Sequence, residues 1–543
     1  MYTSETLASA LEAWREALGH EQVLAGERAA GYGASTLGVE RRIPAVLRPL
    51  STAQVAESVQ VARRYGVPLY SVSRGHNWGY GDANPVTEDC VVVDLSGMTG
   101  IDDTDTAELG VITVEPGVTQ GMLREHLDAL GSDRLVPVHG GGPSCSIVGN
   151  ALERGYGITP YADHFSAVTA VEVVLPDGEI YRSPLSDLGA PRVDRVFKWG
   201  VGPYLDGLFS QSGYGIVTRL TLALAPRPER IEVFSFSVRS PEEVAEAAEA
   251  VRDILREVGG VTGSVNLMND RRVLSMMRSD LADQATQDGI VPQQAIDELA
   301  RSSRTGAWTG FGAMYGTKPV VKAARRMIRK RLRGVGRGLV FITPDRIAQI
   351  RSLLAHLPRR GGKGLWNYVD TVHKSLAIVT GAPSEVALPL AYWKGGTRPD
   401  PASGQALDPG RDGCGLIWYS PLVPMVPEIT REFASRVHRV CSEHGIEPLI
   451  TLTSLSERCF DSTIPLLFDP DDADERDRAH ACYEALLEAG REIGCVPYRA
   501  GIEHMDRFVG PDTPSGRLNA SLKAGLDPDH IIAPGRYCAV PDR

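Results

Sequence analysis

The sequence predicts an α+β protein made of two domains. The chain has 543 residues, which is more than one hydrophobic core usually organises. Residues 1–225 mix strand-like and helix-like segments, without the strand–GxGxxG–helix order of a Rossmann unit. After Pro226-Arg227-Pro228 the pattern changes to longer helices, short strands and a Pro/Gly-rich loop at 395–413. We therefore expect a second α+β domain to follow the first.

Apolar spacing predicts the elements of both domains. Strand-like apolar runs occupy residues 45–49, 67–72, 90–95 and 111–115. Apolar positions recur at helical spacing over residues 5–19, 51–65, 119–130, 242–258 and 427–443. Ser51 is placed to cap its helix, and residues 167–181 form a hairpin that turns at Pro176-Asp177-Gly178. The arginine-rich run 325–333 is interpreted as a solvated helix face.

Composition excludes several classes of protein. The net charge of -11 and the pI near 5.6 argue against a nucleic-acid partner, which requires a basic face. No run of 18 apolar residues predicts a membrane span, and the first residues lack a signal-peptide pattern. The eight cysteines show no CxxC or Cys/His ligand spacing, so we expect no metal site and no disulfide scaffold. A cytoplasmic protein with reduced thiols is expected.

Three glycine-rich stretches stand out as candidate ligand loops. The first, Ser73-Arg74-Gly75-His76-Asn77-Trp78-Gly79-Tyr80-Gly81, follows a strand-like run. Glycines at this density let a backbone approach a ligand and turn its N–H groups toward an anion such as a pyrophosphate. A simple turn explains one such loop equally well. Two more, at 136–157 and 209–219, lie in the same predicted domain, and turns alone do not explain all three.

These motifs together resemble one family of flavoenzymes. SRGHNWGYG (73–81), VEPGVT (114–119), GGGPSCSIVGNALERGYG (140–157), TPYADHF (159–165), FKWGVGPYLDGLFSQSGYGIVTRL (197–220) and DPDHIIAPGR (527–536) occur in that order. The set is similar to the vanillyl-alcohol oxidase/4-cresol dehydrogenase group of FAD enzymes, over most of the chain. Segments around Trp308, Tyr392 and Trp418 have family-like counterparts too.

The resemblance implies a two-domain, PCMH-type fold that binds FAD. Residues 1–228, completed by 500–543, would form the FAD-binding domain, and residues 229–499 a cap over the substrate. The FAD pyrophosphate would lie along the backbone of 74–79 and of 146–150. The family pattern places these residues at the cofactor: Arg74, Gly75, His76, Asn77, Trp78, Gly79, Pro143, Ser146, Ile147, Gly149, Asn150, Tyr161, Gly215, Ile216, Val217 and Arg536.

The resemblance also implies a phenol-binding site. The positions that match the family's two tyrosines and arginine are Tyr80, Tyr498 and Arg499. Two hydroxyl donors and a guanidinium around one oxygen stabilise its anion. A phenolate pushes electrons into its ring, so a benzylic hydride can leave to flavin N5 and give a para-quinone methide. Water addition would then yield an alcohol, and proton loss an alkene.

Two positions depart from the family pattern. The aspartate that the family carries as a base matches Val138 here, and His139 next to it is the candidate base, with a structural capping role as the alternative. The cap position that anchors flavin in the family matches Asp461 or Ser462, and neither suits that task. Because Arg74-Gly75-His76 resembles the RGGH-type loop of the wider superfamily, we expect FAD to be covalently attached at His76. Non-covalent FAD is the alternative, and a second bond at Cys145 is less favoured.

A related activity remains open on the same fold. A berberine-bridge-like oxidase, or an alcohol or sugar oxidase with histidine-linked FAD, would not need Tyr80, Tyr498 and Arg499 around one oxygen. A flavoprotein without redox activity is the other alternative. Oxygen or another acceptor would reoxidise the flavin, and family members suggest a homo-oligomer.

Overall fold

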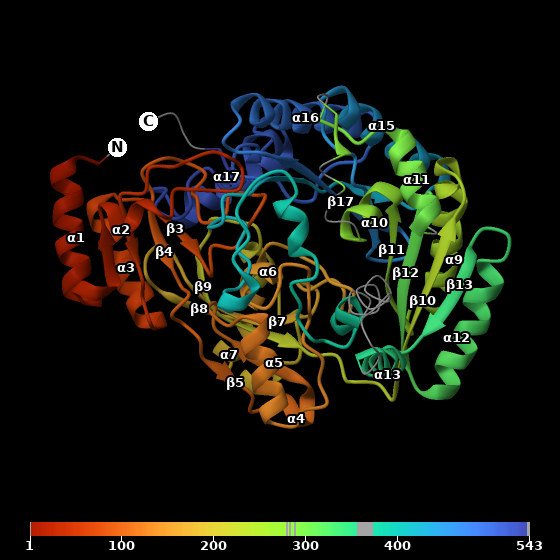
Figure 1. The fold of residues 1–543 in the computed structure, drawn as a ribbon. Helices are drawn as coiled ribbons and strands as arrows, with labels where there is room; N and C mark the ends of the chain where they lie inside the picture. Colours follow the sequence, from red (N-terminus) through yellow and green to blue (C-terminus); the bar gives the residue numbers. More distant parts are fainter. Residues whose placement is uncertain are drawn as a thin grey trace.

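The computed structural model describes residues 2–277, 281, 284–286, 289–303, 305–355 and 373–539. Figure 1 shows the N-terminal helices at one side of the molecule and helices α9 and α12 at the other, with α15 and α16 above the large sheet between them. Within the described residues, no helix combines the length and the apolar character that a membrane crossing needs. Three sheets organise these residues.

The first sheet has four strands in the order β1-β2-β4-β3. Its strands are β1 (Val23–Ala25), β2 (Ala45–Leu47), β3 (Leu69–Val72) and β4 (Val91–Asp94). Helices α1 (Ser4–Leu18) and α3 (Thr52–Tyr65) pack on each other beside this sheet. Ser51 accepts a hydrogen bond from the Gln54 N–H and so caps α3 as predicted, because its hydroxyl satisfies a free N–H of the first turn. β3 ends at Val72, directly before the first glycine-rich stretch.

The second sheet has five antiparallel strands in the order β5-β6-β9-β7-β8. They are β5 (Ile101–Asp102), β6 (Val111–Val114), β7 (Val168–Val174), β8 (Ile180–Arg182) and β9 (Ile216–Ala223). Its core contains apolar side chains of α5 (Gln120–Ala129) and α6 (Ile147–Leu152). The short helices α4 (Thr106–Leu109), α7 (Pro184–Asp187) and α8 (Pro191–Asp194) lie in its connections, and α2 (Glu27–Ala30) lies between β1 and β2 of the first sheet.

The third sheet is long and antiparallel, with the order β13-β10-β12-β11-β16-β17-β14 and β15 beside β17. Its strands are β10 (Arg230–Val238), β11 (Thr262–Asn269), β12 (Trp308–Gly316), β13 (Arg337–Ile342), β14 (Gly415–Tyr419), β15 (Leu422–Pro424), β16 (Thr451–Ser454) and β17 (Cys459–Phe468). The sequence predicts only short strands here, whereas β17 has ten residues and β10 pairs with β12 over nine positions.

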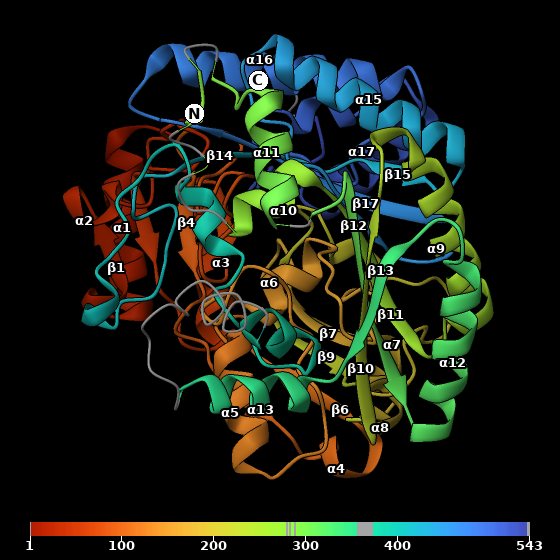
Figure 2. The ribbon, with the colours of Figure 1, turned by 45° about the vertical axis from the view of Figure 1, so that its right-hand side comes forward.

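Helices cover this third sheet on its outer face. Figure 2 shows α15 and α16 side by side along one edge of the molecule, with α9 and α12 beyond the strands. The helices of this half are α9 (Val244–Val258), α10 (Asp270–Met277), α11 (Gln293–Ser303), α12 (Lys318–Arg331), α13 (Pro344–Ala355), α15 (Pro427–Glu443) and α16 (Ala473–Arg491). Much of the apolar core lies between the strands and helices α9, α12, α15 and α16. The α+β prediction for this half is confirmed.

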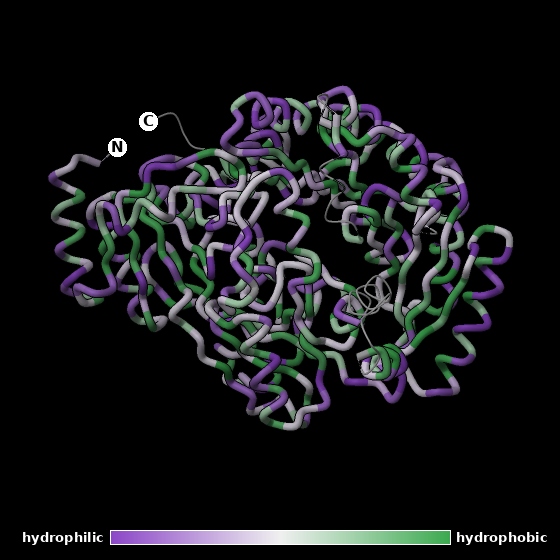
Figure 3. The backbone as a smooth tube through the Cα atoms, viewed as in Figure 1, coloured by the Kyte–Doolittle hydropathy of each residue, from purple (hydrophilic) through white to green (hydrophobic). Residues whose placement is uncertain are grey.

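The arginine-rich run belongs to an amphipathic helix, as predicted. Helix α12 buries Val321, Ala324 and Ile328 against the sheet, and Figure 3 shows its hydrophilic outer side. Arg325 pairs with Glu232 and Arg331 pairs with Asp253 and Glu257, so part of the cluster is neutralised within the protein. This supports a surface role rather than a site for a polyanion.

The C-terminal segment returns to the first half of the chain. It contains helix α17 (Pro514–Leu526), followed by residues that add to the edge of the first sheet. The Leu69 N–H donates to Ile531 and the Ala533 N–H donates to Leu69, both at 2.7 Å. The buried Lys523 ammonium donates to Asp527 and to two backbone carbonyls, which fixes the helix to this segment.

Candidate functional site

A cavity of about 440 Å³ lies where the three sheets meet. The first glycine-rich stretch, the second one and the third sheet all contribute to its wall. All four predicted catalytic residues line it, together with Arg74, Gly75, His76, Asn77, Trp78, Ser146, Gly149, Asn150, Gly215, Val217 and Arg536 of the predicted cofactor set. The structure does not bring Gly79, Pro143, Ile147, Tyr161 or Ile216 to this wall. Tyr161 is 41% exposed.

Residues 74–78 keep their backbone N–H groups available. Among the described residues, no hydrogen bond uses any of these five consecutive donors. Gly79 differs, because its N–H donates to the Thr36 hydroxyl at 2.7 Å. Gly79 also has φ +77°, and a Cβ there would lie 2.3 Å from Trp418 Cδ1. The loop therefore presents an anion-binding backbone over 74–78, while Gly79 packs the loop against β14.

The second glycine-rich stretch uses its own N–H groups. Ser146 caps α6 by accepting from the Gly149 N–H at 3.0 Å. The Asn150 N–H donates to the Ser146 carbonyl, and the Ile147 N–H to Val118. Three of the five donors at 146–150 are thus engaged, whereas no hydrogen bond among the described residues uses the N–H groups of Ser146 and Val148, so a second backbone cradle there stays a prediction. Gly149 and Asn150 still form part of the cavity wall.

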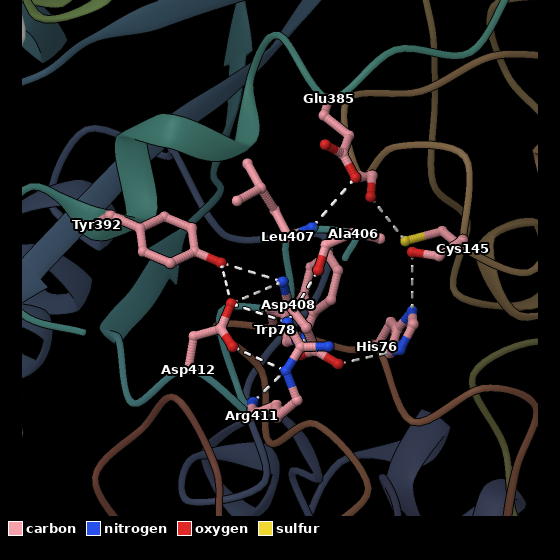
Figure 4. A network of polar contacts seen from close by, with 12 residues as sticks. His76, Trp78, Cys145, Glu385, Tyr392, Ala406, Leu407, Asp408, Arg411 and Asp412 are labelled. Carbon is pink, nitrogen blue, oxygen red and sulfur yellow. Dashed lines mark hydrogen bonds and ion pairs between the residues drawn. The ribbon is translucent and has the colours of Figure 1, made fainter. Parts of the chain in front are cut away.

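His76 belongs to a polar network that joins the first loop to residues 392–412 (Figure 4). Its ring stacks on Trp78 with 4.7 Å between centroids and 18° between planes. Its Nε2 lies 3.6 Å from Asp408 Oδ2, and its Nδ1 lies 3.5 Å from the Ser144 hydroxyl. Trp78 Nε1 donates to the same Asp408 carboxylate. Burial lowers the pKa of His76, and Asp408 partly opposes this effect.

The Asp408 segment is itself held in place by a hydrogen-bonded group. The Tyr392 hydroxyl donates to Asp412 at 2.6 Å, and Arg411 pairs with the same carboxylate. The Asp408 N–H donates to the Tyr392 hydroxyl oxygen and to Asp412. Asp408 therefore faces His76 from a fixed position, and imidazole basicity can be tuned by such a carboxylate.

The two predicted tyrosines and the arginine lie together. The Arg499 guanidinium sits 3.9 Å from the centre of the Tyr80 ring, and its Nη2 donates to Asn77 Oδ1. The Tyr80 hydroxyl is 2.7 Å from the Ser420 hydroxyl, and the Tyr498 N–H donates to the Ser420 carbonyl. Burial raises the pKa of Tyr80 to about 12 and that of Tyr498 well above its usual value. Both tyrosines therefore carry their protons at neutral pH.

Behind this group, two guanidiniums share one carboxylate. The Glu153 carboxylate lies between two guanidiniums, in contact with Arg536 and 3.4 Å from Arg499 Nε. Burial opposes the charge of Glu153, but Arg536 and Arg499 hold its pKa below the usual value. Burial raises the pKa of Asp461 well above its usual range, and Arg499 offsets this only in part. The Glu153 carboxylate is thus shared by two guanidiniums, which suits a bound anion.

His139 lies on the cavity wall, but its hydrogen bonds favour a donor role over that of a base. Its Nδ1 accepts from the Gly141 N–H at 3.2 Å, which places the proton of the neutral ring on Nε2. That Nε2 is buried and has no partner among the described residues. Burial, with a contribution from Arg499, lowers the pKa of His139 to about 4. The ring is therefore neutral at pH 7, and its role as a base stays a prediction.

Several residues of the site lack a signal in the sequence. Glu153 and Asn77 reach Arg499, and Asp408 reaches His76, across long separations in the chain. Asp461 is adjacent to the tyrosines although the sequence assigns it only to the flavin-anchor position. Arg272 also lines the cavity, with no motif around it. Within the part of the chain that the structure describes, no three His, Cys, Asp or Glu side chains gather as a metal site.

Comparisons with known proteins agree with this geometry. The family described as FAD binding domain matches residues 43–183. The chain is 36% identical to 1'-carboxy-chondrochloren decarboxylase of Chondromyces crocatus, over 98% of each protein. It is 26% identical to the 4-cresol dehydrogenase [hydroxylating] flavoprotein subunit of Pseudomonas putida, over 97% of this chain and 94% of that protein. The structure of p-cresol methylhydroxylase with substrate bound matches with a TM-score of 0.86 and 25% identity, over 99% of this chain and 97% of that one.

The residues of the cavity fit FAD, the cofactor of the matching family. Five free N–H groups beside the Arg74 guanidinium suit the pyrophosphate of FAD. The fold is the two-domain PCMH-type fold. The chain thus belongs to the vanillyl-alcohol oxidase/4-cresol dehydrogenase family of FAD-linked oxidases and is an FAD-dependent oxidoreductase.

Proposed function

We propose that this enzyme oxidises para-substituted phenols at the benzylic carbon. The observation that supports this most strongly is the group of Tyr80, Tyr498 and Arg499 on the cavity wall. It offers two neutral hydroxyl donors and a buried cation without a full counter-charge. A phenol oxygen that binds there is stabilised as the phenolate.

The bound phenolate prepares the substrate for oxidation. Negative charge on the ring oxygen raises the electron density of the ring, so a hydride can leave the benzylic carbon and a para-quinone methide forms. FAD, when bound, supplies the two-electron acceptor for that hydride. Arg499 holds the oxygen end in position, while Asn77 and Glu153 orient Arg499. Addition of water to the quinone methide gives a benzylic alcohol, and proton loss gives an alkene.

Loss of carbon dioxide is a third outcome, suggested by the named decarboxylase among the relatives. If the carbon next to the benzylic carbon carries a carboxylate, the bond between that carbon and the carboxylate breaks after the hydride has left. The electron pair forms the new C=C bond and returns the ring oxygen to phenolate, so no further oxidant is needed. Arg272 on the cavity wall favours a substrate that carries such a group.

We also propose a covalent bond between His76 and FAD. Its support is the position of the ring on the cavity wall, with Asp408 at 3.6 Å to assist deprotonation. Arg74 and the N–H groups of 74–78 would hold the pyrophosphate, and Arg536 would face the cofactor from the C-terminal segment. The enzyme is further proposed to be a cytoplasmic homo-oligomer that passes electrons to oxygen or another acceptor. Its eight free cysteines support a reducing compartment.

The proposed reaction is tested by mixing the holoenzyme with 4-alkylphenols in the absence of oxygen. We expect bleaching of the oxidised flavin by the phenol and none by its methyl ether, which cannot form a phenolate. Equal bleaching by the ether would refute the proposal and favour an alcohol or sugar oxidase. Product analysis then separates alcohol, alkene and carbon dioxide, and a peroxide assay identifies oxygen as the acceptor.

A further inference from the structure

Two neighbouring arginines at the start of α10 have different environments. Arg271 is 4% exposed and fully engaged, because its guanidinium contacts Glu447, the Val291 carbonyl and the Gln293 side chain. Arg272 turns to the other side and lines the cavity. Between the described residues, no hydrogen bond or ion pair involves the Arg272 guanidinium, and its Nη1 is buried without a partner. One arginine is thus structural, and the other is left for a ligand.

The charge of Arg272 persists although it has no counter-ion in the protein. Burial lowers the pKa of Arg272 to about 10, so the guanidinium stays protonated at neutral pH. A buried cation without a partner destabilises the folded state, because its lost hydration is not replaced. Natural cores avoid such groups unless a bound anion completes them. An anion in the cavity would satisfy Arg272.

The sheet register separates Met268, four residues before Arg272, from the row that contains Asp461. Asp461, whose charge contributes to the raised pKa of Tyr498, lies in one cross-strand row with Thr453 and Asn266. The next row, about 7 Å further along the strands, contains Thr463, Thr451 and Met268.

Beyond Met268 the chain leaves strand β11 and enters helix α10, which contains Arg272. This helix packs against the 3₁₀ helix Leu388–Tyr392. The cavity wall also carries the apolar side chains of Leu388, Leu390, Trp418 and Leu467. An aromatic ring with an alkyl substituent suits a cavity of this composition, with one polar group toward Arg499 and another toward Arg272.

We propose that Arg272 binds a carboxylate on the side chain of the substrate, so that the natural substrate is a para-substituted phenol with an anionic substituent. This rests on the proposed phenol oxidation. A carboxylate fits better than a phosphate ester, because its single negative charge is balanced by one guanidinium, whereas a phosphate ester carries about -1.5 to -2 at pH 7. The backbone N–H groups of residues 74–78, which suit a phosphate, belong to the FAD-binding half of the chain and not to α10.

The test uses ligands that cannot be oxidised at the benzylic position. In (4-hydroxyphenoxy)acetate, -propanoate and -butanoate an ether oxygen replaces the benzylic carbon, and the corresponding amides are uncharged partners of similar shape. Binding to the holoenzyme is measured by titration calorimetry. We expect at least one acid to bind the wild type roughly 10- to 100-fold more tightly than its amide. Arg272→Met should remove this preference, and Arg272→Lys should keep part of it.

Two further measurements separate the possible failures. Arg439→Met, an exposed variant on α15, should leave the acid preference unchanged. Flavin content and Tm of Arg272→Met should equal or exceed those of the wild type, because the arginine has no partner to lose. A loss of flavin would assign Arg272 to the cofactor, and a lower Tm would assign it to the fold; either result overturns the inference.

Equal binding of acid and amide by the wild type also overturns it. The proposed phenol oxidation is judged independently, because Arg272→Met should still be reduced by uncharged 4-alkylphenols. If neither enzyme is reduced by any phenol while the acid preference depends on Arg272, the proposed reaction fails and the anion site stands.

Discussion

Arg499→Met tests the electrostatic basis of the proposed reaction. The Arg499 guanidinium lies against the Tyr80 ring at 3.9 Å, buried, and shares one carboxylate with Arg536. A cation within about 4–6 Å lowers the pKa of an acid by about 1–3 units, and each unit corresponds to about 1.4 kcal/mol. We therefore expect Arg499→Met to raise the pKa of a bound phenol by about 1–3 units relative to the wild type.

The assay uses 4-hydroxyacetophenone, which has no benzylic hydrogen and changes its absorption spectrum on ionisation. The pKa of the bound ligand is read from difference spectra at a series of pH values. Tyr498→Phe removes a donor but no charge, so its effect should be smaller. Arg124→Met, on α5 beside Asp128, should have none. A bound-ligand pKa that is the same in the wild type and Arg499→Met would refute the phenolate-binding role of this group.

Three other outcomes are expected. His76→Ala should release flavin into the supernatant after acid precipitation, whereas wild-type flavin stays in the pellet; free flavin from both proteins would contradict the covalent bond. Glu153→Gln leaves Arg499 and Arg536 buried without their carboxylate, so urea unfolding should show a loss of about 3–5 kcal/mol, and an unchanged midpoint would contradict the ion-pair interpretation. The folded-state pKa of His139 is about 4 against about 6.5 unfolded, so the unfolded chain binds the extra proton between these values. From pH 7 to pH 4 the contribution of His139 to the free energy of unfolding should fall by about 3 kcal/mol. The wild type should therefore lose about this much more stability than His139→Asn, and equal slopes in the two proteins would count against the buried neutral ring.

Local patterns in the sequence predict individual helices in both domains. The apolar spacing of residues 51–65 and the capping Ser51 give helix α3 to within one residue, and the helix predicted at 427–443 has those bounds as α15. Such features depend on neighbours within a few positions. The third sheet depends on pairs such as Arg230 with Gly316 and Gly415 with Phe468. No short-range pattern encodes these pairings, so the sequence indicates strands here but not their length or order.

The site shows the same division. Tyr498 and Arg499 are found only through resemblance to a family, because nothing in their local sequence distinguishes them from surface residues. The adjacent arginines 271 and 272 make the limit clear, since identical side chains in one helical turn face a buried glutamate and an open cavity. Whether a guanidinium is neutralised depends on Glu447, which is distant in the sequence. The domain limits at 228 and 499 stay predictions.

The return of the C-terminal segment determines when the enzyme can become active during its synthesis. Tyr498, Arg499 and Arg536 leave the ribosome long after residues 4–223. The bridge between Leu69 and Ile532 also forms only once this later segment has been made. The strands and helices of residues 4–223 can form earlier, but the wall of the cavity around Glu153 cannot close. Stable loading of the cofactor is therefore expected only after these residues have been synthesised, and a ribosome-bound chain halted before residue 498 should not retain flavin.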